Sequence, residues 1–381
     1  MVITSKPVKF ILFALVGLMS SVMMANTTPE AINATQEHAV EHEMTQRVSE
    51  HNDQKPEDVN EAIVHHLKDD HYYTFFHDSD THQHFGFPLP VILIDNGLKV
   101  FLSSEFDHGN AVVEKDGQYY KYYHSKIYKT DAEGTITYDE NGNPTNAKPL
   151  DFSITKNVAG LLLASVLIFL GFTALAKTYK TSPNNLPKGF ARVLEPLVLY
   201  VRDEMAIPNI GQKQYKKFMP FLLSVFFLIF LLNLLGLTPL GLNVTGNISV
   251  TLCLALFTFF VTSFSGNKDY WKHIFWMPGV PVPMKFVLAP IEVLGMLTKP
   301  FSLMIRLFAN ITAGHSVVMG LISVVFIMKA TLGVIGGTAV TFLLTTFLTF
   351  LELLIAFLQA FIFTMLSSLF IGQAVQEHEE H

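Results

Sequence analysis

The stretch KPFSLMIRLFANITAGHSVV, residues 299–318, decides the fold, because it places one arginine inside an apolar run of membrane-spanning length. Arg306 is the only formal charge between Lys299 and Lys329. A guanidinium at membrane depth costs at least ~2.5–3.5 kcal/mol on insertion scales, so such a residue marks a functional site by default. The rest of the chain is interpreted around this arginine.

Composition places the chain among membrane proteins. Half of its 381 residues are hydrophobic and only 15% are charged, and the mean hydropathy is +0.36. The apolar residues concentrate after residue 157, in runs that can cross a bilayer. The net charge of −6 comes without a basic cluster, which excludes a nucleic-acid partner. The single cysteine, Cys253, lies in an apolar run and excludes a disulfide framework and a cysteine metal site.

Residues 1–25 have the pattern of a secretory signal peptide. Lys6 and Lys9 precede a short apolar core at 10–16, and small residues continue up to Ala25. An uncleaved first helix is the alternative. Under either interpretation, we expect the segment that begins at residue 26 to be exported.

Residues 26–150 form a polar, acidic segment that holds eleven of the fifteen histidines. The histidine spacings match no tight ligand pattern, so we expect a hydrated exported module without a metal site or a cofactor. Two β-rich runs within 87–102 flank Asp95-Asn96-Gly97, a hairpin signal. Residues 119–130 and 134–139 predict further strands, and 140–144 a turn. The module is therefore expected to be small and mixed or β-rich.

Residues 151–376 predict an all-α polytopic membrane domain of about five helices, followed by a cytoplasmic tail at 377–381. The first span is Val158–Ala176, and the basic residues after it place the N-terminal module outside by the positive-inside rule. The remaining membrane segments are 218–237, 248–264, 284–328 and 339–372. The last two exceed the length of a perpendicular span, so we expect both helices to be strongly inclined, with a turn at 332–337.

Two features of this domain leave alternatives open. Residues 190–201 have helical apolar spacing, which fits a helix on the inner membrane surface and, nearly as well, a helix packed on a neighbouring subunit. Polar residues near or within the second and third spans fit hydrogen bonds between helices and a wet path equally. These residues are Asn233, Asn243, Asn247 and Thr251.

The topology assigns depths to the intramembrane charges. Glu292 falls toward the cytoplasm and Arg306 near mid-depth, while His315 and Glu352 come to similar depth toward the outside. A structural salt bridge would explain a His–Glu pair, but Arg306 has no acidic residue three or four places away on its own helix. We therefore expect its counter-charge on another polypeptide.

Four segments together resemble subunit a of the F-type ATP synthase membrane sector in bacteria. They are KPFSLMIRLFANITAGHSVV at 299–318, LELLIAFLQAFIFTMLSSLF at 351–370, MPFLLSVFFLIFLLNLLGLTP at 219–239 and TGNISVTLCLAL at 245–256. The resemblance covers roughly residues 157–376. The exported extension, which most members of that family lack, falls outside it.

The resemblance implies roles for individual residues. Arg306 would face the ring of c subunits, whose carboxylates supply the missing partner, with Asn310 and Gln359 as polar support. Glu292 would belong to the inner half-channel, and His315 with Glu352 to the outer one. His315 and Glu352 stand in the order of mitochondrial-type members, whereas many bacterial members have the two exchanged.

The expected function is that of a proton-channel stator subunit in the bacterial inner membrane, without a catalytic site or cofactor of its own. Its partners would be the c-subunit ring, the b-subunit stator, other ATP synthase subunits and the lipid membrane. A standalone proton or cation transporter is the alternative, which would carry its own carboxylate for Arg306 and an inverted repeat. A purely structural stator anchor is another, but it would not need three polar groups at membrane depth.

Overall fold

The computed structural model describes residues 69–77, 84–139, 144–181, 189–238, 242, 244–277 and 279–376. The predicted signal peptide and most of the histidines lie outside these residues. Inside the last helix, the side chains of 310–313, 315–335, 337–338 and 341 are also outside the description. The chain divides into two compact units, Met19–Leu161 with Thr238–Val244, and Leu162–Leu237 with Thr245–His381. We call them the N-terminal unit and the membrane unit.

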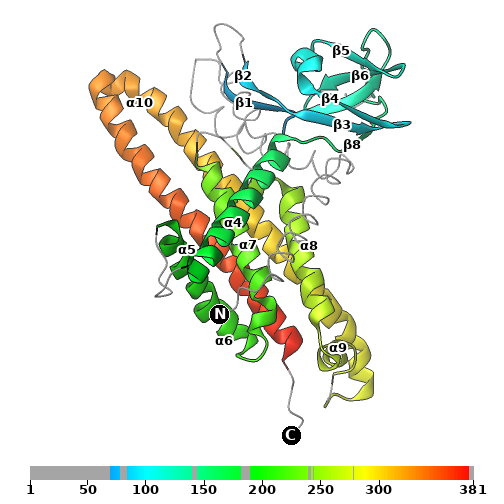
Figure 1. Cartoon of the computed structure of the whole chain (residues 1–381), viewed down its shortest axis with the longest axis vertical. Helices are drawn as coiled ribbons and strands as arrows, with labels where there is room; N and C mark the ends of the chain where they lie inside the picture. Colours follow the sequence, from blue (N-terminus) through cyan, green and yellow to red (C-terminus); the bar gives the residue numbers. More distant parts are fainter. Residues whose placement is uncertain are drawn as a thin grey trace. The chain divides into compact units, whose positions relative to one another are not determined.

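The described residues of the N-terminal unit form eight short strands in three small antiparallel sheets (Figure 1). A two-stranded sheet pairs β1 with β2, and the two three-stranded sheets have the orders β4-β3-β8 and β5-β6-β7. The strands are β1 Tyr72–His77, β2 His84–Pro88, β3 Pro90–Ile94, β4 Leu98–Leu102, β5 Val112–Lys115, β6 Gln118–Tyr123, β7 Lys126–Thr130 and β8 Leu150–Asp151, with a 3-10 helix η1 at Ser103–Gly109. The prediction of a β-rich module is confirmed.

Local sequence accounts for two of the turns. Ile94 pairs with Leu98 across the predicted hairpin, and Asn96 and Gly97 adopt φ of 50° and 139°. These positive values favour asparagine and glycine, because a Cβ meets the backbone there. His124 and Ser125 form the turn that connects β6 to β7, and they also have positive φ, of 47° and 61°.

The predicted strand at 134–139 is wrong. The described residues there form only one bridge, between Tyr138 and Pro144. The amide of Asn146 replaces a strand partner, since its Nδ2 donates to the carbonyls of Lys129 and Thr135 and its Oδ1 accepts from the Thr137 backbone N–H. A side chain that satisfies backbone groups in this way competes with sheet pairing.

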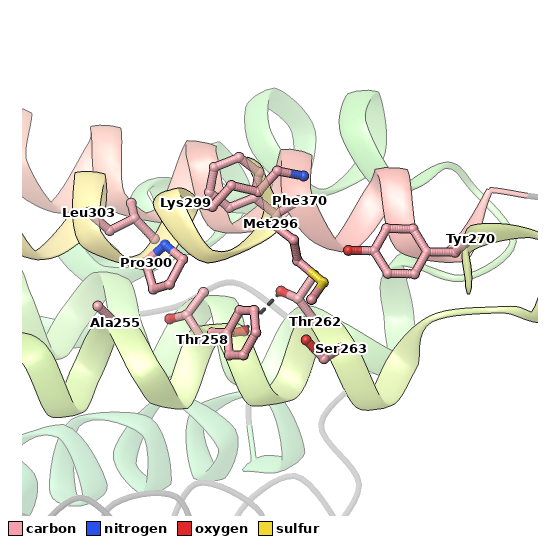
Figure 2. A pocket seen from close by; sticks show the side chains of 11 residues that line it. Ala255, Thr258, Thr262, Ser263, Tyr270, Met296, Lys299, Pro300, Leu303 and Phe370 are labelled. Carbon is pink, nitrogen blue, oxygen red and sulfur yellow. Dashed lines mark hydrogen bonds between the residues drawn. The ribbon is translucent and has the colours of Figure 1, made fainter. Parts of the chain in front are cut away.

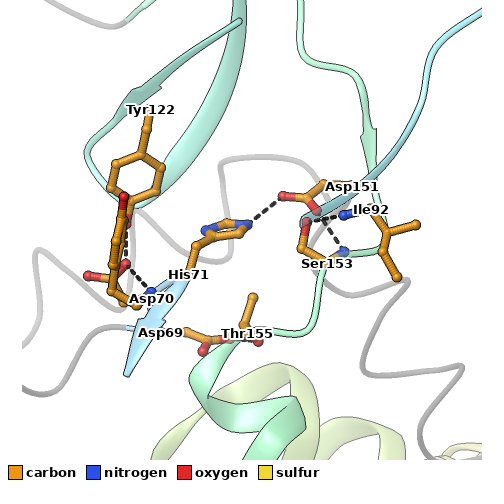
Figure 3. Close-up of polar contacts among 9 residues, drawn as sticks. Asp69, Asp70, His71, Ile92, Tyr122, Asp151, Ser153 and Thr155 are labelled. Carbon is orange, nitrogen blue, oxygen red and sulfur yellow. Dashed lines mark hydrogen bonds and ion pairs between the residues drawn. The ribbon is translucent and has the colours of Figure 1, made fainter. Parts of the chain in front are cut away.

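A buried polar cluster joins the module to the start of the first membrane helix (Figure 3). His71 Nε2 lies 2.9 Å from the carboxylate of Asp151 on β8. Asp69 accepts from the Thr155 hydroxyl at 2.9 Å and from the backbone N–H of Asn157 at 3.0 Å. The Tyr122 hydroxyl donates to Asp70. These bonds tie β1, β6 and β8 to the first turn of α4, Lys156–Thr181.

The membrane unit is helical, and five helical segments of the described chain are long and apolar enough to cross a membrane. They are Lys156–Lys180, Tyr215–Gly236, Ile248–Ser265, Val282–Ala309 and Phe342–Val375. The helices that carry them are α4, α7 (Tyr215–Gly236), α8 (Ile248–Ser265) and α10 (Val282–Val375). The prediction of a polytopic helical protein with about five spans is confirmed.

Helix α10 contains two spans and reverses between them (Figure 1). Lys299 Nζ donates to Gln373 Oε1 at 3.1 Å, although a straight helix would separate these residues by ~110 Å. We call Val282–Ala309 the first arm and Phe342–Val375 the second arm. Residues 332–337, where the sequence predicts a turn, keep a helical backbone. The 34-residue second arm is ~50 Å long, so it can cross a ~30 Å core only when strongly inclined.

The predicted amphipathic segment forms α5 (Phe190–Tyr200), a π-helical turn η2 (Val201–Ala206) and α6 (Ile207–Ile210). It packs on this chain's own second arm rather than only on a membrane surface or a neighbouring subunit. Asn209 Nδ2 donates to the Ser368 hydroxyl at 3.0 Å, and the Tyr200 ring lies 6.0 Å from that of Phe361. Helix α9 spans Lys268–Phe275 and precedes α10.

Candidate functional site

Arg306 lies on the first arm, at the border between a buried and an exposed face. Leu303 and Leu307 are almost fully buried, while Ile305 is 55% exposed, and Arg306 itself is half-buried. Arg306 makes no hydrogen bond or ion pair with any residue that the structure describes. The guanidinium therefore has five donors to offer to a group outside the described part of this chain.

The charged residues of the first arm form one stripe. Glu292, Lys299 and Arg306 follow one another at intervals of seven residues. Seven residues fall only ~20° short of two helical turns, so the three side chains leave the helix on nearly the same side. The spacing was present in the sequence, but its meaning depends on the second arm.

The second arm carries a matching stripe of Glu352, Gln359 and Gln373, again at multiples of seven. The two stripes meet at the Lys299–Gln373 hydrogen bond, where the Lys299 ammonium also lies 5.0 Å from the centre of the Phe370 ring. Gln359 is buried, with 2% of its surface exposed. The two stripes therefore belong to facing sides of the arms where they meet.

This contact sets the register between the arms. Arg306 lies seven residues beyond Lys299, and Gln359 fourteen before Gln373. At ~1.5 Å per residue the two are offset by ~10 Å along the hairpin, with Gln359 nearer its bend. By the same count the backbones of residues 315 and 352 are offset by ~8 Å along the hairpin.

The side chains of Asn310 and His315 lie outside the described set, and only their helical backbone is described. Glu352 is half-buried and forms no hydrogen bond or ion pair with the described residues. The proposed His315–Glu352 pair therefore stays a prediction. Glu292 likewise lacks a hydrogen-bond partner in the described chain and is half-buried.

A small cavity of about 10 Å³ lies beside the first stripe, between α8, α9 and both arms (Figure 2). Its polar lining comes from Thr258, Thr262 and Ser263 on α8, Tyr270 on α9 and Lys299. The Ser263 hydroxyl is buried without a hydrogen-bond partner in the described residues, and a cavity of this volume holds about one water. Sequence reasoning missed this group, because only packing brings α8, α9 and α10 together.

Tyr270 connects this cavity to Glu292. Burial raises the pKa of the Tyr270 phenol, and the negative charge of Glu292 raises it further. Such an interaction requires the two groups to be near one another. Glu292 is therefore near Tyr270, one of the residues that line the cavity.

The polar residues of the α7–α8 hairpin have structural partners. The Thr245 hydroxyl donates to Asn233 Oδ1 at 2.8 Å, and Asn247 caps α8 by accepting from the Ser249 N–H at 2.9 Å. The Thr251 hydroxyl donates to the carbonyl of Ile248. The Asn233–Thr245 bond joins α7 to the turn, whereas the bonds of Asn247 and Thr251 are local to the start of α8. Asn233 Nδ2 is buried without a hydrogen-bond partner in the described residues, so both alternatives stay open, and Asn243 lies outside the described chain.

Comparison with known proteins identifies the family. The model of the ATP synthase A chain family matches residues 158–372, more than half of the chain. The chain belongs to this family. It is similar to the protein named ATP synthase subunit a 2 of Chlorobaculum tepidum, with 46% identity over 61% of this chain and 66% of that protein. It is also similar to ATP synthase subunit a 2 of Prosthecochloris aestuarii, with 39% identity over 78% of this chain and 94% of that protein.

The ATP synthase A chain match contains every residue of the two stripes except Gln373, which follows its last residue. The Prosthecochloris alignment covers 78% of this chain and is therefore longer than the 158–372 match, so it includes part of the N-terminal residues. A second family model, Domain of unknown function (DUF8433), matches residues 62–152. The membrane domain and the N-terminal module of this chain thus match two different family models.

Proposed function

We propose that this chain is the proton-channel stator subunit a of an F-type ATP synthase in a bacterial inner membrane. Family membership supports the assignment, and the observation that carries it is Arg306, half-buried at the edge of an exposed apolar face and without a partner among the residues that the structure describes. A charge in that position requires a counter-charge from a neighbouring molecule. The carboxylates of a rotating c-subunit ring have the chemistry to provide it.

Arg306 acts in this proposal as a fixed positive barrier. Arginine suits the role because it does not deprotonate at physiological pH, whereas a buried lysine can. An ionised ring carboxylate is attracted to it, while a protonated carboxylate is not. The barrier keeps protons from passing directly between two half-channels.

The outer half-channel would use His315 and Glu352, and the inner one Glu292. A proton entering from outside neutralises a ring carboxylate, which can then enter lipid at low cost. After nearly a full rotation the carboxylate reaches the inner path, releases its proton near Glu292 and returns to Arg306. Asn310 and Gln359 supply polar support. Each proton that crosses 100 mV yields ~2.3 kcal/mol to drive rotation.

The positive-inside rule supports the orientation of this subunit. Lys177, Lys180 and Arg192 follow the first span, so we infer a periplasmic N-terminal module and a cytoplasmic C-terminus. The b-subunit stator is the expected second partner, because a channel subunit that must not rotate needs an anchor. ATP chemistry would belong to other subunits.

The deciding experiment replaces Arg306 in the assembled synthase. Arg306→Ala is expected to abolish ATP-driven proton pumping and ATP synthesis, while a passive proton leak through the membrane sector rises. Arg192→Ala, which removes an exposed positive charge on α5, is the matched control and should keep both activities. Coupled ATP synthesis by the Arg306→Ala enzyme would refute the barrier.

The outer pair has its own test. Exchanging the two residues, His315→Glu with Glu352→His, keeps one acid and one imidazole at this depth. We expect the exchanged enzyme to retain more proton-driven ATP synthesis than either His315→Ala or Glu352→Ala. Equal loss in all three variants would mean that the two positions do not act as a pair.

A further inference from the structure

The sheet β4-β3-β8 and the chain that continues from it have an outer face made only of apolar side chains. Buried and exposed residues alternate along each strand, so every second residue lies on this face. The face, called here the outer apolar face, consists of Leu98, Val100 and Leu102, Pro90, Ile92 and Ile94, and Leu150, Phe152 and Ile154. Val100 and Leu102 are 60% and 48% exposed.

Strand pairing makes these residues neighbours. Val100 pairs with Ile92, and the backbone N–H of Phe152 donates to the Ile92 carbonyl at 2.8 Å. One row further, Leu102 pairs with Pro90, whose carbonyl accepts from the Ile154 N–H at 3.0 Å. Residues opposite each other on one face of an antiparallel pair have Cβ atoms ~5 Å apart. The outer apolar face is therefore continuous across the three strands.

An antiparallel sheet that has water on one side normally shows polar residues there. The other three-stranded sheet of the same module has Glu114 and Lys121 on its outer side. Strand β3, in contrast, reads PVILI and is apolar on both sides. A contiguous exposed apolar patch on a soluble module marks a surface that contacts a protein or a membrane.

The chain itself indicates which of the two covers it. Ile154 still pairs with β3, and α4, the first membrane span, begins two residues later at Lys156. From Ile154 to Val158, where the apolar run starts, is at most ~13 Å. The headgroup layer on each side of a ~30 Å core is ~5–8 Å thick. The row of Leu102, Pro90 and Ile154 therefore begins at or next to the headgroup layer.

We propose that the outer apolar face rests on the outer leaflet, with its side chains at the boundary between headgroups and acyl chains. Asp69 bonds Thr155 and Asn157 at the start of α4, so contact of the outer apolar face with the leaflet would also fix the depth at which α4 starts.

The test places a fluorophore on the face in the assembled synthase. Val100→Cys and Leu102→Cys are made singly in a Cys253→Ser background, with Gln118→Cys on the other sheet as the matched control. The complexes go into nanodiscs of phosphatidylcholine and phosphatidylglycerol, which leave both membrane sides open to solution. Quenching by acyl-brominated phosphatidylcholine is compared with quenching by aqueous iodide.

We expect brominated lipid to quench labels at positions 100 and 102 but not at 118, and iodide to quench position 118 several-fold more than the other two. Iodide quenching at 100 and 102 equal to that at 118 would place the face in water and overturn the proposal. Protection from both quenchers would mean that a polypeptide covers it, which overturns it equally. The unsubstituted protein provides a second readout: a photoreactive acyl-chain lipid should label the peptide containing 98–102, and absence of that label counts against lipid contact.

Discussion

The two units treat their charges in opposite ways. In the N-terminal unit, charges on the strands find partners within the chain, as in the pairs Lys129–Asp95 at 2.7 Å and His71–Asp151 at 2.9 Å. In the membrane spans, Glu292, Arg306 and Glu352 form no ion pair with any described residue. Among the described residues, charges of the first unit thus form ion pairs, whereas these three charges of the second do not.

The cost of an unpaired charge explains why this difference is informative. In water an isolated surface charge is solvated and needs no partner, and a surface pair contributes at most ~1 kcal/mol. In a bilayer the same charge costs several kcal/mol unless it is neutralised or hydrated. An arginine without a partner among the described residues is therefore inexpensive on the module but costly on α10, where we propose that another molecule neutralises it.

The contact between the second arm and α6 shows how closely the helices of the membrane unit pack on one another. A Cβ added to Gly372 would lie 2.1 Å from the carbonyl oxygen of Asn209, a backbone atom that cannot rotate away. Gly372→Ala should therefore separate α6 from the second arm and cost ~1–3 kcal/mol or more. The expected result is a lower thermal stability of the purified chain and reduced accumulation in membranes.

Gly295→Ala, on the first arm of the same helix, is the matched control, because no atom lies within 4 Å of its added Cβ. Alanine there should leave the thermal stability of the chain unchanged or slightly higher, since alanine favours helix more than glycine does. Equal destabilisation by both substitutions would mean that helix propensity, and not the contact with Asn209, sets the effect.

The sequence was sufficient for features that depend on neighbours along the chain. Apolar runs of seventeen or more residues predicted the spans, because a helix satisfies all its backbone hydrogen bonds within one segment in lipid. Asp95-Asn96-Gly97 predicted its hairpin, because positive φ at Asn96 and Gly97 is a local requirement. Arg306 was found by its cost at membrane depth.

Features that depend on distant neighbours were missed. The meeting of the two stripes needs the register of the α10 hairpin, which the Lys299–Gln373 contact fixes and no local signal encodes. The polar cavity needs α8 and α9 beside α10, and Thr258 or Ser263 read singly as ordinary helix residues. The false strand at 134–139 failed because the Asn146 side chain, reaching back across the chain, satisfies its backbone instead.

The stability of the N-terminal unit should depend on pH, because the unit contains the buried His71–Asp151 pair. Measuring that dependence would sharpen the comparison. Burial opposes the charge of His71, but Asp151 and the neighbouring Asp70 and Asp69 outweigh it and raise its pKa above 6.5. Burial likewise opposes the charge of Asp151, yet His71 lowers its pKa below 3.8. Tyr122 and Lys156 also face this cluster.

These directions set the sign of the pH effect. The contribution of His71 is complete below its unfolded pKa and is lost as pH rises through its folded pKa, while that of Asp151 is lost as pH falls through its own folded pKa. Asp69 opposes the acid-side loss that comes from Asp151. Burial raises the pKa of Asp69, so its protonation as pH falls removes a buried charge and stabilises the fold. Protection of β1 and β8 from hydrogen exchange, corrected for intrinsic rates, should therefore decline above pH ~6.5.

Asp151→Asn should remove that decline and cost ~3 kcal/mol below pH 6, because it leaves the buried imidazolium unpaired. Asp116→Asn is the control: its pair with Lys99 spans 4.0 Å and Asp116 is 83% exposed, so the change should cost well under ~1 kcal/mol. A pH profile that survives in the Asp151→Asn protein would show that another group of the cluster titrates.

The smallest expected effect concerns the one polar contact that joins the two stripes. The hydrogen bond from Lys299 to Gln373 and the position of its ammonium over Phe370 should together couple the arms by ~0.5–1 kcal/mol. Lys299→Met and Gln373→Leu should therefore be non-additive by that amount in the unfolding free energy measured in bicelles by steric trapping. Lys285→Met paired with Gln373→Leu should be additive, since the Lys285 ammonium lies over Trp276 instead, 4.5 Å from the ring centre. Additivity in both pairs would mean that apolar packing alone holds the arms, and that the membrane unit leaves all its intramembrane charges to its partners.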